Sequence, residues 1–260
     1  MMNILRADIY RMVRSKSLYI TCALLFAYIL LIVGTMQAIN IGGNMFLEDS
    51  SDLLFDGANI IVTLASRMDT LIYFLLPLSL LVSSPMFTNN TIKNDIAWGI
   101  SRSKLYFSKI LLSSILCVFM LLFYVVVGML IATVLHGFGA AISTDMWINL
   151  IQMLSSQLFM LLVMNSIIIS LMFTTKRTIV VTGAYIGFSL VPMVVLSILL
   201  ESNPTLITLL NFDIPITIRR FANINLMDSS EVIKLFTVGV SYMLIATTIG
   251  LLSFRKADIQ

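Results

Sequence analysis

Few residues of this chain are of the types that enzymes use for chemistry. Its one histidine, His136, excludes a two-histidine zinc motif and has no evident nucleophile partner. The two cysteines, Cys22 and Cys117, lack the paired spacing of a metal site or a disulfide framework. No glycine-rich segment ends in the Gly-Lys-Ser/Thr of a phosphate-binding loop. We therefore expect no enzyme activity, no ATP hydrolysis and no cofactor or metal in this chain.

Milder polar residues stand inside an apolar segment. Gln152, Gln157 and Asn165 fall within one hydrophobic run, where they could hydrogen-bond to neighbouring helices or line a polar cavity; we favour packing. No ionisable residue lies at the centre of a hydrophobic run, whereas proton- or ion-coupled carriers usually need one. If the protein transports a substrate, the energy is expected to come from elsewhere.

The elements that must position these residues are hydrophobic runs. Of the 260 residues, 59% are hydrophobic and 11% are charged, whereas a soluble domain carries about 25% charged residues. Runs of about 20 apolar residues are long enough to cross a hydrocarbon core of roughly 30 Å as α-helices. They predict an all-α integral membrane protein with six transmembrane helices, over Leu18–Ala38, Thr70–Phe87, Ile110–Leu135, Leu150–Phe173, Thr178–Leu200 and Val232–Phe254.

The charges predict an orientation. If both termini are cytoplasmic, most of the 16 basic residues lie inside and most of the 13 acidic residues lie outside. Residues 1–17 form a predicted amphipathic helix along the inner interface. The basic inner face suits membrane lipid with anionic headgroups, and we expect no nucleic-acid binding. Aromatic and lysine side chains near the run ends are expected to be interfacial anchors: Tyr19, Tyr106, Lys109 and Trp147.

The segment between the second and third runs reads TNNTIKNDIAWGISRSKLYFSK over residues 88–109 and is too long for a tight turn. Thr88 and its polar neighbours can cap a helix, and Ser103 can cap the next one. Ile96 and Trp98 offer apolar contacts. The segment therefore predicts a short helix that projects into the cytoplasm.

This segment resembles the corresponding loop of type-2 permeases of ATP-binding cassette (ABC) transporters. That loop follows an acidic, Gly, Ser/Arg, Lys pattern ahead of the third helix, and Asp95, Gly99, Arg102 and Lys109 match it. The layout of the whole chain is similar as well. The resemblance implies that residues 88–104 couple the permease to a separate ATPase subunit, which would bind ATP and Mg, through Asp95, Ile96, Trp98, Gly99, Arg102 and Lys104.

Two segments nearer the C-terminus leave alternatives open. Residues 201–231 contain an apolar stretch that is too short and too interrupted to span the membrane. It is either a re-entrant or interfacial hairpin, as the resemblance implies, or an ordinary outer loop packed against the bundle. Gly183 and Gly187 form a small-xxx-small pair, for which packing within one subunit is favoured over an interface between permeases.

The sequence thus predicts a single permease domain over residues 1–260, in the cytoplasmic membrane of a bacterium. The expected partners are ABC ATPase subunits and a second permease copy or a paralogous permease. The resemblance is to small permeases that export antimicrobial peptides or confer immunity to them, so a hydrophobic or amphipathic peptide is the expected cargo. The alternatives are a non-transport membrane scaffold and an intramembrane lipid-modifying enzyme, although an enzyme should show clustered catalytic groups, which we do not find.

Overall fold

The computed structural model describes residues 2–35, 57, 59–88, 91–139, 144–202 and 209–256. Within these ranges every regular element is a helix, and six helices are long and apolar enough to cross a membrane. The chain is an all-α membrane protein, as predicted. Its long helices are α2 (Lys16–Thr35), α4 (Leu71–Thr88), α6 (Arg102–His136), α7 (Thr144–Thr175), α8 (Thr178–Ser202) and α10 (Ser229–Lys256).

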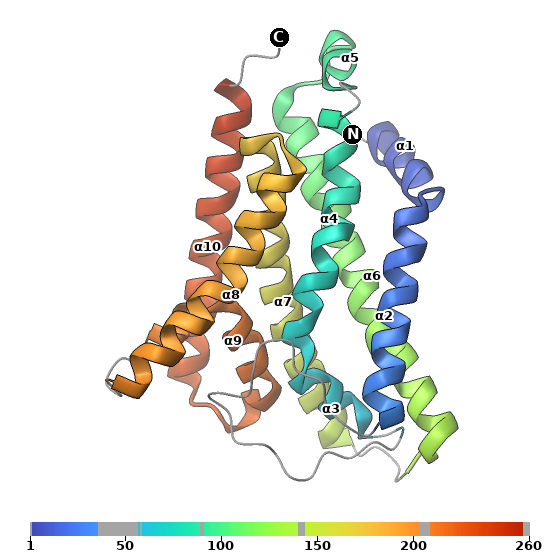
Figure 1. Ribbon diagram of the computed structural model, residues 1–260, viewed down its shortest axis with the longest axis vertical. Coiled ribbons are helices and arrows are strands. Elements are labelled where there is room, and N and C mark those ends of the chain that lie inside the picture. The colour runs from blue at the N-terminus through green and yellow to red at the C-terminus, as the bar shows by residue number, and fades with distance from the viewer. Residues whose placement is uncertain are drawn as a thin grey trace.

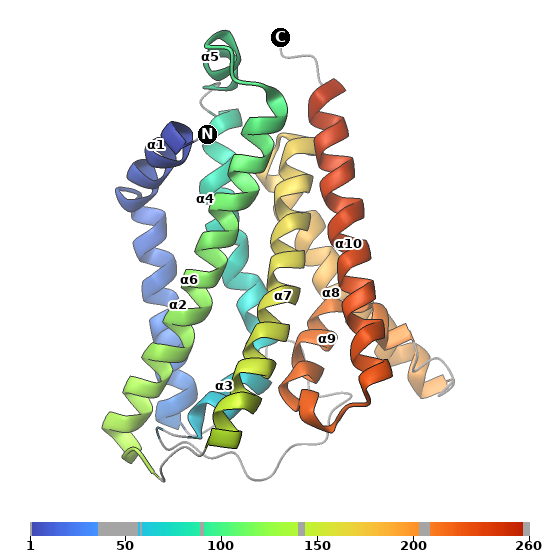
Figure 2. The ribbon, with the colours of Figure 1, turned by 180° about the vertical axis from the view of Figure 1, so that it is seen from behind.

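The long helices form a bundle around α7. This helix contacts α4, α6, α8 and α10, while α2 packs on α4 and α6 at one side. The start of α8 lies near α7, whereas its C-terminal part leans away from the bundle in both views (Figures 1 and 2). Pro192 lies inside α8, and its missing N–H removes one helical hydrogen bond.

Short helices close the two ends of the bundle (Figure 1). At one end, called the α5 end here, lie α1 (Met2–Val13), α5 (Thr91–Ala97) and the last turn of α10. At the other, called the α9 end, lie α3 (Ile60–Ser66), η1 (Met68–Thr70), α9 (Ile214–Arg220) and η3 (Phe221–Leu226). The sequence did not predict α3, whose apolar residues other than Val62 are buried in the core.

The prediction of an interfacial anchor is wrong for two of the four residues. Tyr19 and Trp147 are exposed, but Tyr106 and Lys109 are buried. The ring of Tyr106 packs edge-on against Phe173, with ring centroids 5.0 Å apart. These side chains are covered because α6 begins at Arg102, well before the predicted apolar run, and its first turns pack inside the protein.

The glycines that allow close helix packing are different from the predicted pair. A Cβ placed at Gly183 or Gly187 would meet no described atom within 4 Å, so this pair makes no close helix contact with the described residues of the subunit. A Cβ at Gly250 would lie 2.9 Å from the Cα of Ser170. Gly250 therefore sets the close approach of α10 to α7.

Candidate functional site

At the α5 end, a short helical segment presents one large aromatic side chain. Gly99 ends α5 with a φ of +78°, and its N–H donates to the carbonyl of Ile96 over 2.9 Å; glycine tolerates this conformation well. Ile96 packs against the cluster that contains Met86 and Phe173. Trp98, in contrast, is 86% exposed. The segment is thus anchored at its base and carries an uncovered indole at its tip.

The other predicted coupling residues are placed differently. Lys104 is exposed, and Asp95 lies in α5, although its side chain is outside the described part of the structure. Arg102 donates hydrogen bonds to the carbonyls of Phe254, over 3.3 Å, and Arg255, over 2.7 Å. These are terminal carbonyls of α10, so Arg102 ties the start of α6 to the end of α10.

A buried ion pair joins the amphipathic helix α1 to the bundle. The Nζ of Lys109 lies 2.5 Å from Oδ2 of Asp8, and both side chains are buried. Arg11 reaches Oδ1 of Asp8 at 3.1 Å. Next to this cluster, Met12 packs against Val82. The sequence analysis did not single out Asp8, which ties α1 to α6.

Two of the three amides predicted in the fourth spanning helix join helices. Asn165 accepts a hydrogen bond from Ser79 of α4, over 2.7 Å, and donates to Ser113 of α6, over 2.9 Å. Gln157 donates to the carbonyls of Ala65 in α3 and Ile218 in α9. Gln152 is exposed. Through these hydrogen bonds, Gln157 and Asn165 hold α7 against its neighbouring helices, which is a packing role.

The α9 end contains a buried charge pair that sequence reasoning missed. Nη2 of Arg219 lies 2.5 Å from Oδ2 of Asp69, and the two side chains are 11% and 10% exposed. The pair connects α9 to η1, which directly precedes α4. Nearby, Arg220 pairs with Glu231 and also donates to Asn211, so the segment before α10 is held by several polar contacts.

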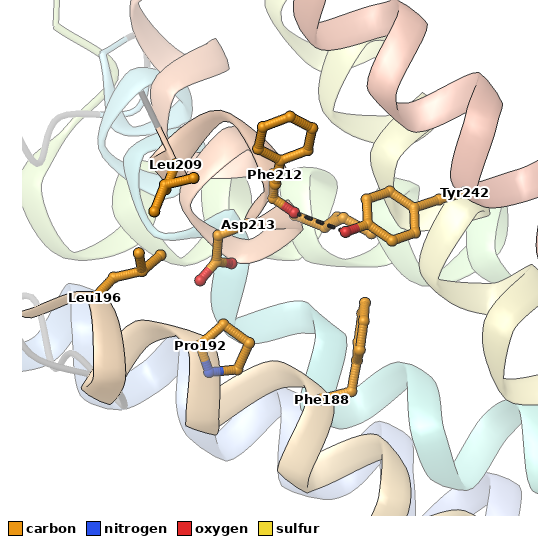
Figure 3. Close-up of a pocket in the computed structure, with 8 residues that line it drawn as sticks. Phe188, Pro192, Leu196, Leu209, Phe212, Asp213 and Tyr242 are labelled. Carbon is orange, nitrogen blue, oxygen red and sulfur yellow. Dashed lines mark hydrogen bonds between the residues drawn. The ribbon is translucent and has the colours of Figure 1, made fainter. Parts of the chain in front are cut away.

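A cavity of about 130 Å³ lies between α8, the residues that precede α9, and α10. Aromatic and aliphatic side chains surround a single carboxyl group, that of Asp213 (Figure 3). Oδ1 of Asp213 accepts the N–H of Ile216 over 3.4 Å and caps α9. Tyr242 donates its hydroxyl to the carbonyl of Phe212 across the cavity, over 3.3 Å. The lining is Phe188, Pro192, Leu196, Leu209, Phe212, Asp213, Ile214 and Tyr242.

The buried position of Asp213 predicts a dependence of stability on pH. Burial raises the pKa of its carboxyl from 3.8 to about 6, the Ile216 N–H opposes that rise, and the charge of Asp69 adds to it. The folded state therefore binds the proton more tightly than the unfolded state. Protonation of Asp213 therefore stabilises the folded state. This contribution is fully present below the unfolded pKa of 3.8 and is lost as the pH rises through the folded pKa of about 6.

We expect wild type to lose about 3 kcal/mol of unfolding free energy relative to Asp213→Asn between pH values of about 4 and 7. Asparagine keeps a capping oxygen but does not titrate. The measurement is unfolding in mixed micelles at a series of pH values. Parallel profiles for the two proteins would contradict the raised pKa.

The fold defines the class of protein: a multi-pass, all-α membrane protein. Among the described residues, no group of three or more His, Cys, Asp or Glu side chains is placed to hold a metal ion. In comparisons with known proteins, no family model matches the chain and no curated protein matches it.

Proposed function

We propose that the chain is the permease subunit of an ABC transporter and that it couples to a separate ATPase through the segment around α5. The observation that carries the proposal is the exposed Trp98 on a segment whose base is anchored in the bundle. Large aromatic side chains are frequent energetic centres of protein interfaces. A partner that covers this indole would bury a large apolar area.

The attachment of this segment also supports a coupling role. α5 connects directly to α4 and α6, and Arg102 at the start of α6 is hydrogen-bonded to the end of α10. A displacement of α5 would therefore reach three long helices: α4 and α6, which it joins, and α10, which Arg102 binds. Such rigid elements can pass the motion of an ATPase into a bundle.

In this proposal the α5 end faces the cytoplasm, because basic residues of short loops are retained there. ATP and Mg are bound by the ATPase, and a second permease copy or a paralogous permease completes the transporter. The cargo is a hydrophobic or amphipathic peptide, exported across a bacterial cytoplasmic membrane for secretion or self-protection. The low charge content of the chain, 11%, fits an apolar cargo.

The test is co-purification from native membranes in mild detergent, with bound proteins identified by mass spectrometry. We expect wild type to retain an ATPase and Trp98→Ala to retain about one tenth as much or less, since removing a central interface aromatic costs at least about 2 kcal/mol. Trp98 is preferable to Arg102, whose replacement would also disturb α10.

The matched control is Trp147→Ala, which removes the other tryptophan, also exposed, from the α9 end of α7. This variant is expected to retain the ATPase as wild type does. Wild-type protein that brings down no ATPase, under conditions that preserve other membrane complexes, would overturn the proposal and favour a scaffold. A retained ATPase whose turnover does not respond to any amphipathic peptide would also favour a scaffold.

A further inference from the structure

The cavity beside α8 holds a buried carboxylate oxygen that lacks a partner. Asp213 is 4% exposed. Its Oδ1 caps α9, but no described residue donates a hydrogen bond to its Oδ2. Figure 3 shows the carboxyl group projecting towards Pro192, into the space between α8 and the residues before α9. An unsatisfied buried oxygen of this kind is costly and needs an explanation.

The nearby cations are engaged elsewhere. Arg219 pairs with Asp69, and Arg220 pairs with Glu231. None of the described basic side chains forms an ion pair with Asp213. The protein thus places an acidic group in an apolar cavity without supplying its counter-charge from the described residues.

The remaining walls of the cavity suit an organic cation. Phe188 of α8 and Tyr242 of α10 both line the cavity and lie on the same side of the carboxyl group (Figure 3), and aromatic rings attract ammonium groups. Pro192, Leu196 and Leu209 supply aliphatic surface. The volume of about 130 Å³ is similar to that of an engineered apolar cavity of about 150 Å³ that binds benzene, so it accommodates an ammonium group and a few methylenes.

We infer that this cavity binds the ammonium end of an amphipathic alkylamine, with Asp213 as its counter-ion and the apolar tail leaving past Leu209 and Phe212. Both of these residues are exposed at the border of the cavity. The ligand class is a primary ammonium group on an apolar body, from either a lipid headgroup or a lysine side chain of an amphipathic peptide. The inference does not depend on an ATPase partner.

The test uses a dodecylamine that carries a diazirine beside the amine, with the protein purified in dodecyl maltoside near neutral pH. Photolabelled residues are mapped by mass spectrometry, with unmodified dodecylamine as competitor. We expect saturable labelling around Phe188, Phe212 and Tyr242, and weaker labelling by about tenfold in Asp213→Asn, since a charge-assisted hydrogen bond is lost. Asp228→Asn, which neutralises an exposed carboxylate before α10, should label as wild type does.

The matching diazirine alcohol separates recognition of charge from apolar partition and needs no variant. Equal saturable labelling by the alcohol and the amine in wild type would overturn the inference, as would undiminished labelling of a folded Asp213→Asn. Competition by phosphatidylethanolamine would support the inference with a lipid headgroup as the source of the amine. Competition by a lysine-bearing amphipathic peptide, and not by its norleucine analogue, would support it with a peptide as the source.

Discussion

Replacing Arg219 with alanine is expected to lower the free energy of unfolding by about 3 kcal/mol or more. The substitution leaves the carboxylate of Asp69 buried without its ion-pair partner. The other oxygen of that carboxylate, Oδ1, already has no hydrogen-bond partner among the described residues. A charge in this position is therefore strongly destabilised. The measurement is unfolding by sodium dodecyl sulfate in mixed micelles, followed by circular dichroism.

Two further variants test this explanation. Asp69→Leu combined with Arg219→Met should recover most of the lost stability, because apolar residues of similar volume often replace a buried ion pair at little cost. Glu231→Ala breaks the pair with Arg220, whose side chains are more exposed, 22% and 38%, and should cost less than about 1 kcal/mol. Equal losses in Arg219→Ala and Glu231→Ala would contradict the burial of the Asp69 pair.

Helix number and approximate position could be predicted because the bilayer imposes a simple rule of length and apolarity. The beginnings of helices were less accurate. α6 begins at Arg102 and α7 at Thr144, whereas the apolar runs begin at Ile110 and Leu150. A helix of 35 residues is about 52 Å long, so α6 extends beyond a hydrocarbon core of roughly 30 Å. Hydropathy marks only the apolar part.

The charge pairs could not be predicted from the sequence. Asp8 and Lys109 are separated by 101 positions, and Asp69 and Arg219 by 150, so only the folded bundle shows that they meet. One signal was present. Asp8 is the only acidic residue among residues 1–17, and it lies on a helix otherwise suited to an anionic interface. An acidic residue in that position favours an internal partner over lipid headgroups.

The candidate site was partly visible in the sequence. The pattern around Asp95 to Lys104 drew attention to the segment that carries the exposed Trp98. It could not show that Arg102 binds the end of α10, because that contact joins residues 153 positions apart. Asp213 falls within the interrupted apolar stretch of residues 201–231, and the sequence does not indicate that it is buried beside aromatic rings.

Replacing Gly250 with alanine is expected to disrupt the contact between α10 and α7. The new Cβ would lie 2.6 Å from the hydroxyl of Tyr106 and 2.9 Å from the Cα of Ser170. The backbone of α7 cannot move aside as a flexible side chain can, so the helices must separate. The hydrogen bond of 2.9 Å between Tyr106 and Ser170 would be strained as well.

Between helices in lipid, close packing replaces the hydrophobic effect as the main attraction, so the separation has a large effect. Overpacking of this kind costs about 1–3 kcal/mol. Gly183→Ala is the matched control, since a Cβ there meets no described atom within 4 Å, and alanine should add up to about 1 kcal/mol of helix stability. Unfolding in mixed micelles measures both variants. If Gly250→Ala were as stable as Gly183→Ala, α10 could not pack against Ser170 as closely as the structure places it.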